Sequence, residues 1–338
     1  MKTVPRPLLS RGAPLLALAL VVLLAGCGRG RKKGEPAYVS VPQASLRDRL
    51  ASVYNKVATV KNAERVEVLD RDKRFALVRT SSGAQGWIEQ RYLVTQKTFD
   101  GFQKLAKDTQ DSPVQAGAIT RNDTNLHLDP ERDAEHLYQV SQGAKVAILK
   151  RAAREKRLPG APAKPEENNA SGGAKPMEDW WLVRDADGHA GWVLGRMVDV
   201  DVPLDIAQYA EGQRIVASFV LNEVKDGDKK VPQYLLLFTE PKDGLPFDYN
   251  QARVFTWNVK RHRYETAYRE RLNGMLPVTV GKENFEKEGD LPVFTLRAQD
   301  NSGNIGERKY KLNTPIVHRV DQSSVVGRPS SGKAKPRN

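Results

Sequence analysis

The stretch LVRTSSGAQGWIEQRYL, Leu77 to Leu93, has a near copy further along the chain in LVRDADGHAGWVLGRMV, Leu182 to Val198. The shared residues keep a constant offset of 105 residues, so this match contains no gap. Upstream, VEVL (Val66 to Leu69) corresponds to VAIL (Val146 to Leu149) at an offset of 80 residues. The chain therefore contains one small domain twice, and the second copy carries an insertion, which a surface loop absorbs at modest entropic cost.

The insertion follows Lys150 and ends before Met177. It reads RAAREKRLPGAPAKPEENNASGGAKP and has no periodic apolar face. Segments of this composition do not bury enough apolar surface to become ordered. Residues 151–176 are therefore predicted to be a disordered loop inside the second copy.

Each copy alternates apolar and polar residues over short runs that end at Gly, Asp or Ser, which predicts half-buried antiparallel strands. Gly83 and Gly188 supply the positive φ angle that tight hairpin turns require. With several short strands and no helix of useful length, each copy is expected to form a small closed barrel.

Four motifs of the first copy bear on its family: LRDR from Leu46, VEVL from Val66, FALVR from Phe75 and GAQGWIEQRYL from Gly83. Together they resemble the bacterial SH3-like (SH3b) domain. The second copy resembles it too, but has Met197 in place of the tyrosine.

The resemblance implies two small SH3-like barrels, over residues 37–95 and 114–202. Domains of this kind commonly hold cell-wall peptide or protein segments in a groove between loops. About half of the aromatic residues in so small a barrel must fill its core, so a structural role is the alternative for the tryptophans. The candidates for ligand contact are Tyr54, Trp87 and Tyr92 in the first copy and Trp181 and Trp192 in the second.

The N-terminal segment has the pattern of a secretory signal. Basic residues precede an unbroken apolar run from Leu15 to Ala25, which is too short to span a bilayer. The run ends in LAGC, which resembles the lipobox of bacterial lipoproteins, where the cysteine is lipidated. Cys27 is the only cysteine of the chain. The alternative is an ordinary signal peptide in which Cys27 stands by chance.

We therefore predict a lipoprotein signal peptide over residues 1–26 and a lipidated basic linker over residues 27–36. The resemblance to lipoproteins implies a membrane-anchored protein that faces the periplasm. Gly28 follows the cysteine where Asp would favour the inner membrane, so the outer membrane is the expected location.

The net charge of +13 does not indicate a nucleic-acid-binding protein. The positive charge is concentrated in the N-terminal segment, the insertion and the C-terminal tail, which leaves the predicted domains close to neutral. A basic face on a folded domain, the usual sign of nucleic-acid binding, is not predicted. Basic segments beside a lipid anchor favour anionic lipids or glycan polymers, or are solvated linkers without a partner.

The remainder of the chain predicts a helix and a further domain. Residues 96–113 form an amphipathic helical linker between the two barrels. Residues 203–321 contain strand-like runs separated by turns such as KDGD, and predict a third all-β domain, a sandwich or a barrel, of no recognised family. Strand alternation places Tyr264 and Tyr268 on the same face of one strand. Residues 322–338 are expected to be a disordered basic tail.

No catalytic, cofactor or metal site is predicted. The sequence lacks the H-E-x-x-H, G-x-S-x-G and C-x-x-C motifs. Asp185 and Asp187 begin like a calcium loop, but the later oxygen ligands are missing, so a turn is favoured. The chain is accordingly predicted not to be an enzyme.

The fold class predicted is all-β, with two SH3-like barrels followed by a third β domain. The function expected from the resemblance is that of a lipid-anchored envelope protein whose tandem SH3-like domains bind cell-wall material, peptidoglycan. An envelope scaffold or assembly lipoprotein that binds another protein is the alternative. A weaker alternative is enzyme activity in the C-terminal domain.

Overall fold

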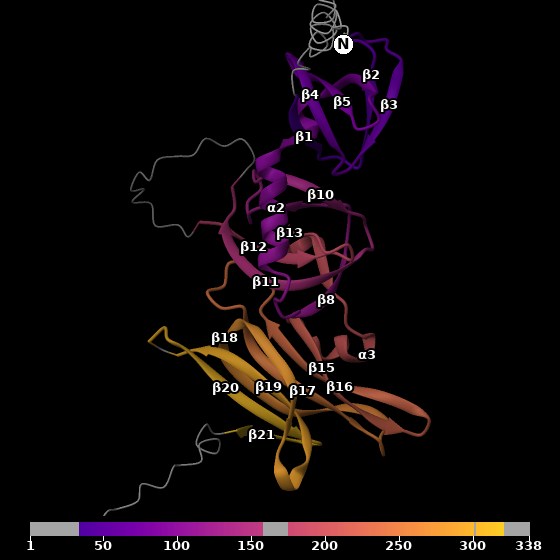
Figure 1. The fold of residues 1–338 in the computed structure, drawn as a ribbon. Coiled ribbons are helices and arrows are strands. Elements are labelled where there is room, and N and C mark those ends of the chain that lie inside the picture. The colour runs from indigo at the N-terminus through magenta and orange to yellow at the C-terminus, as the bar shows by residue number, and fades with distance from the viewer. Residues whose placement is uncertain (1–33, 158–174, 301, 321–338) are drawn as a thin grey trace, which may run out of the picture.

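The computed structural model describes residues 34–157, 175–300 and 302–320. Three antiparallel sheets of seven strands each follow one another along the chain, and Figure 1 shows them arranged in a row, with the first domain and the third at opposite ends. This confirms the prediction of an all-β fold. Cys27 and the predicted tail lie outside the described residues. No helix of the described part has the length and apolar character needed to cross a membrane.

The first sheet closes around a small core that includes Leu46, Val60 and Val78. Its strand order is β3-β2-β6-β5-β4-β1-β7. The β5–β6 hairpin turns at Gly83, whose φ of 89° is costly for other residues. The strands are β1 (Glu35–Val39), β2 (Gln43–Arg47), β3 (Lys56–Lys61), β4 (Arg65–Asp72), β5 (Phe75–Thr80), β6 (Gln85–Glu89) and β7 (Leu93–Thr95), with the short helix η1 (Gln90–Tyr92) before β7.

The second sheet repeats this order as β10-β9-β13-β12-β11-β8-β14. Its hairpin turns at Gly188 with a φ of 87°. A Cβ atom on Gly191 would lie 2.5 Å from the Cβ atom of Leu126, so this position before the tryptophan must be glycine. The strands are β8 (Ala116–Thr120), β9 (Thr124–His127), β10 (His136–Val140), β11 (Lys145–Glu155), β12 (Met177–Arg184), β13 (Ala190–Leu194) and β14 (Val198–Val200), with η2 (Gly195–Met197) before β14.

The disordered loop was predicted over residues 151–176, and its predicted start is wrong. Strand β11 continues to Glu155 and pairs with β12, so that Arg151 lies opposite Trp181. The prediction failed because the charged run after Lys150 is typical of a solvated loop. In the structure this run begins as a strand, and its Arg151 is buried in ion pairs. Residues 158–174 of the insertion lie outside the described residues.

Helix α2 (Gln96–Asp108) joins the first two domains. The Thr95 side chain caps it by accepting a hydrogen bond from the backbone N–H of Thr98. Phe99 stacks on Tyr38 of the first domain with ring centroids 4.0 Å apart. Phe102 meets Tyr138 of the second domain edge to face. The apolar face of the helix is therefore used for packing.

The third domain begins with two short helices and continues as a meander in which each strand pairs with the next. The sheet curls, so that the first strand also contacts the fifth. The elements are α3 (Leu204–Ala207), η3 (Gln208–Ala210), β15 (Arg214–Asp226), β16 (Lys229–Thr239), β17 (Tyr249–Asn258), β18 (Arg263–Asn284), η4 (Glu286–Glu288), β19 (Asp290–Gln299), β20 (Ile305–Asn313) and β21 (Ile316–Val320).

Both faces of this sheet bury apolar side chains. Leu235 and Leu237 of β16 face the core that continues into the second domain, whereas Leu236 and Phe238 face the core covered by Ile206 of α3. Continuous burial along β16 is expected of a strand covered on both sides.

A β-bulge contradicts the predicted alternation along β18. Val254 pairs with Tyr268 but the next residue, Phe255, pairs with Thr266, so one residue of β18 has no partner. The bulge moves Tyr264 into the core beneath α3, whereas Tyr268 packs on the opposite core. The two tyrosines therefore lie on different faces of the sheet.

The second and third domains contact each other through Gln115. The Gln115 side chain, fully buried, accepts a hydrogen bond from the backbone N–H of Val278 at 2.8 Å and donates to its carbonyl oxygen at 3.3 Å. The Gln115 carbonyl oxygen accepts a hydrogen bond from the backbone N–H of Ser218. One glutamine thus acts as a strand partner for β18.

Candidate ligand-binding pocket

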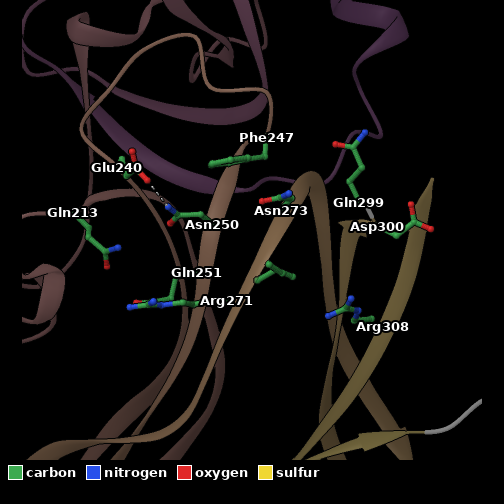
Figure 2. Close-up of a pocket in the computed structure, with 11 residues that line it drawn as sticks. Gln213, Glu240, Phe247, Asn250, Gln251, Arg271, Asn273, Gln299, Asp300 and Arg308 are labelled. Atoms are coloured by element: carbon green, nitrogen blue, oxygen red, sulfur yellow. Dashed lines mark hydrogen bonds between the residues drawn. The ribbon is translucent and has the colours of Figure 1, made fainter. Parts of the chain in front are cut away.

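A polar pocket with a volume of about 840 Å³ opens in the third domain. It lies beside residues 240–248, which join β16 to β17, and Figure 2 shows its side chains arriving from several strands. The lining side chains are mostly amides and charged groups, with two apolar residues. They are Gln213, Glu240, Phe247, Asn250, Gln251, Arg271, Leu272, Asn273, Gln299, Asp300 and Arg308.

A buried guanidinium organises one wall of the pocket. Arg253, 3% exposed, donates to the Oε1 atom of Gln251 and, at 2.9 Å, to the Oε1 atom of Gln213. It also donates to the Tyr209 carbonyl oxygen at 2.9 Å and lies 4.7 Å above the ring centroid of Phe238. These contacts hold two pocket amides in fixed orientations.

The electrostatics of this wall involve several cations. Burial, followed by the positive charge of Arg269, lowers the pKa of Arg253. Glu211 opposes this effect by forming ion pairs with Arg253 at 3.2 Å and with Arg269 at 4.0 Å. Arg271 lies opposite Gln251 in the β17–β18 register, and Figure 2 shows the two side chains next to each other. Within the described ranges of the chain, Arg271 forms no ion pair.

A second wall presents hydrogen-bond acceptors. The Nδ2 atom of Asn250 donates to Glu240 at 3.4 Å. The Oδ1 atom of Asn250 is buried, and none of the residues that the structure describes donates a hydrogen bond to it. A buried acceptor without a donor costs about 1–3 kcal/mol, and because this oxygen is enclosed, a ligand in the pocket does not reach it.

The third wall is already neutralised. Arg308 pairs with Glu270 at 2.5 Å, and Glu270 also accepts hydrogen bonds from Tyr310 at 2.6 Å and Tyr268 at 2.9 Å. Burial, reinforced by Glu270, raises the pKa of both tyrosines. Burial alone would lower the pKa of Arg308, but the hydrogen bond and charge of Glu270 outweigh it and raise this pKa.

The Asp300 carboxylate is hydrogen-bonded within its own turn. It accepts hydrogen bonds from the backbone N–H groups of Asn304 at 2.9 Å and Ser302 at 2.8 Å. These bonds lower the pKa of Asp300, so its carboxylate is charged at neutral pH. Arg271 is therefore the cation of this pocket whose charge no described carboxylate balances.

The second domain supports the pocket loop. Arg151 of β11 donates to the carbonyl oxygens of Phe247 at 2.9 Å and Leu245 at 3.2 Å. The same guanidinium pairs with Asp179 at 2.6 Å and Asp248 at 3.2 Å. Burial alone would lower the pKa of Arg151, but both carboxylates together raise it. The loop that carries Phe247 is thus fixed by a residue of another domain.

The aromatic residues predicted in the first domain lie on separate elements. Tyr54, 38% exposed, lies in the loop between β2 and β3, with the Cζ atom of Arg47 4.3 Å from its ring centroid. Trp87 is half-buried on β6, opposite Leu77. Tyr92 lies in η1 and packs against the first core.

The predicted residues of the second domain also lie apart from the pocket. Trp181 is 4% exposed and lines a separate cavity of about 500 Å³ that also includes Arg214 of the third domain. Trp192 is half-buried on β13, opposite Leu182. None of the predicted aromatic residues lines the pocket of the third domain.

The sequence contains one sign of the pocket. Arg253 stands inside the apolar strand ARVFTW, and a charged residue at such a position must find buried partners. Of those partners, Gln251 lies two residues earlier on the same strand, whereas Gln213 lies in the loop before β15 and could not be identified from the sequence.

The Asp185, Asp187 and His189 side chains bring ligand atoms within 4.8 Å of one another. Asp185 accepts hydrogen bonds from the backbone N–H groups of Asp187 at 3.0 Å and His189 at 2.9 Å. His189 also stacks on the Tyr138 ring. These contacts are those of a hydrogen-bonded hairpin turn.

No family model matches this chain, and no curated protein matches it. Among solved structures, NlpC2 from Trichomonas vaginalis is 11% identical, with 85% of this chain and 96% of that chain covered and a TM-score of 0.17. An NlpC/P60 family protein from Bacillus cereus ATCC 10987 is 10% identical, with coverage of 83% and 95% and a TM-score of 0.22. NlpC1 from Trichomonas vaginalis is 11% identical, with coverage of 86% and 92% and a TM-score of 0.17.

These matches contradict two predictions. Proteins of the NlpC/P60 family are cysteine peptidases or amidases. The prediction that the chain is not an enzyme is therefore withdrawn, as is the prediction of a module whose tandem SH3-like domains bind cell-wall material. At TM-scores of 0.17–0.22, none of these structures assigns an activity or a residue role to this chain. Cys27, its single cysteine, lies outside the described residues.

Proposed function

We propose that this chain is a lipid-anchored envelope protein whose third domain binds a small, hydroxyl-rich ligand of the saccharide class. The observation that supports the ligand is the pocket of about 840 Å³, which is lined mostly by amide and charged side chains. The lipid anchor is supported by the sequence that ends at Cys27.

The ligand class follows from the hydrogen-bonding groups of the pocket. Amide side chains both donate and accept, as hydroxyl groups do, whereas an apolar ligand would leave these groups without partners. Phe247 and Leu272 add a limited apolar surface for the C–H groups of a sugar ring. A volume of about 840 Å³ lies within the usual range of small-ligand pockets.

The order of the domains suits an anchored binding protein. The described chain starts at the first domain, and Figure 1 shows the third domain at the opposite end of the row. Helix α2 and the Gln115 interface hold consecutive domains together. An anchor at Cys27 would therefore keep the pocket at a distance from the membrane.

The test for binding is isothermal titration calorimetry of the full chain in detergent micelles. The probes are paired neutral and acidic monosaccharides: glucose with glucuronate, and galactose with galacturonate. At least one sugar should bind, and Asn273→Leu, which removes an exposed amide from the pocket lining, should weaken that binding about 2- to 13-fold, because one hydrogen bond is worth about 0.5–1.5 kcal/mol. Asn284→Leu is the control, because Asn284 is an exposed residue at the end of β18 that lies outside the pocket lining and donates to Asp290. Absence of heat with every sugar would refute the proposed ligand class.

The anchor is tested separately. The wild-type chain should fractionate with membranes and carry the added mass of acyl chains, whereas Cys27→Ser should yield precursor or released protein. An unmodified wild-type chain in the soluble fraction would refute the lipid anchor without affecting the pocket.

A further inference from the structure

We infer that the pocket selects a carboxylate-bearing ligand, whose carboxylate binds the Arg271 guanidinium and the amide nitrogens of Gln213 and Gln251. Arg253 orients those amides and is a positioning residue. The inference rests on the proposed function, since it names the charged group of the same ligand.

The orientation of the two amides follows from donor and acceptor chemistry. A guanidinium has only donors, so each amide that meets Arg253 must present its oxygen. Gln213 and Gln251 both do so. Their Nε2 atoms therefore point away from Arg253, and neither donates a hydrogen bond to another of the described residues. Each of the two amides therefore has an unused donor, and both residues line the pocket.

Arg271 completes the donor set. It is exposed, lies opposite Gln251 in the sheet register, and has no carboxylate partner in the described part of the chain. The other cations of this wall differ, because Arg253 and Arg269 both pair with Glu211. Three donors, of which one is charged, form a site for an anionic oxygen group.

The charge of the pocket favours a carboxylate over a phosphate. A planar guanidinium matches a planar carboxylate in a bidentate pair. The single unbalanced cation offsets one negative charge, whereas Glu240 and the ionised Asp300 line the same pocket and oppose a dianion. A monoanionic ligand with hydroxyl groups, such as a uronic acid, combines both requirements.

Arg253 acts through the amides and does not reach the ligand itself. The carbonyl oxygen of Tyr209 and the ring of Phe238 hold its guanidinium in the buried position. The segment that contains Tyr209, Glu211 and Gln213 is thereby tied to β17. Selectivity for the anion is thus built from a contact between this segment and the sheet.

The experiment compares each uronic acid with its neutral sugar by calorimetry on the full chain in detergent micelles. The wild-type protein should bind glucuronate at least tenfold more tightly than glucose, because hydrogen bonds to a charged group are about twice as strong as those between neutral groups. Arg271→Gln should remove this preference and leave the affinity for glucose within about twofold. Arg263→Gln, at the first residue of β18 and paired with Glu265, is the matched control and should retain the preference.

The orientation is tested by Gln213→Glu. The substituted carboxylate still accepts from Arg253, so the wall remains folded, but its second oxygen replaces the outward donor and repels the ligand's carboxylate. Binding of glucuronate should fall at least tenfold while that of glucose persists. Unchanged binding of glucuronate to this variant, or a preference that survives Arg271→Gln, would overturn the inference while the proposed function stands. Tighter binding of glucose 6-phosphate than of glucuronate would also overturn it, and binding of none of these sugars would overturn the proposed function as well.

Discussion

Replacing Arg151 by methionine should loosen the contact between the second and third domains. The side chain is nearly fully buried, donates to Asp179 and Asp248, and holds the carbonyl oxygen of Phe247. Methionine keeps much of the volume but leaves two buried carboxylates without their shared cation. Removal of one partner from a buried ion pair costs about 3–5 kcal/mol.

The lower end of that range applies here, because both carboxylates keep other partners. Asp179 still meets Arg214 at 3.2 Å, and Asp248 still accepts the backbone N–H of Leu276 at 2.7 Å. We therefore expect a loss of about 3 kcal/mol. For a cooperative unit of about 150–250 residues, this corresponds to a decrease in Tm of about 6–12 °C.

Two measurements on the full chain test this expectation. Circular dichroism should report the lower Tm, and hydrogen exchange should show faster exchange in residues 244–248, since the loop loses its anchor. Arg154→Met is the matched control, because Arg154 is an exposed residue of the same strand whose guanidinium donates to its neighbour's carbonyl oxygen. Equal Tm values and equal exchange for the two variants would refute the reasoning.

Further predictions concern other parts of the molecule. Gln115→Ala should destabilise the domain interface by about 2–4 kcal/mol, because the buried N–H and C=O groups of Val278 lose their partner; a Tm equal to that of wild type would contradict this, with Gln110→Ala as the exposed control. Burial raises the pKa of Tyr264 from its ordinary value of 10.0 to about 12. The neutral phenol therefore contributes stability that is intact below about pH 10 and is lost as the pH rises towards 12, so the Tm of Tyr264→Phe should depend less steeply on pH in this window than that of wild type; parallel profiles would count against it. Deletion of residues 158–174 should change stability by only about 1 kcal/mol, because loop closure varies logarithmically with length; loss of cooperative unfolding would show that these residues belong to the fold.

The local sequence pattern predicted much of the fold, because strand alternation and turn chemistry depend on residues close together in the chain. The glycines that close the two hairpins were recognisable from the sequence, and Gly83 and Gly188 do have positive φ angles. The all-β class followed from the same signals. The function did not follow, since the resemblance of the repeated motif led to a binding module that the comparison with solved structures contradicts.

Tertiary structure decided what periodicity could not. One unpaired residue opposite Val254 and Phe255 separates Tyr264 from Tyr268, because a shift of one residue in a strand exchanges its faces. The pocket likewise joins Gln213, Gln251 and Arg271, which come from three different segments, through pairings over tens of residues. Alternation in a sequence predicts which positions of a regular strand are buried, but it identifies neither a bulge nor the distant strand that lies opposite. The sequence alone therefore shows which aromatic and charged residues are available to form a site. Their grouping into a site depended on strand register and on contacts between domains.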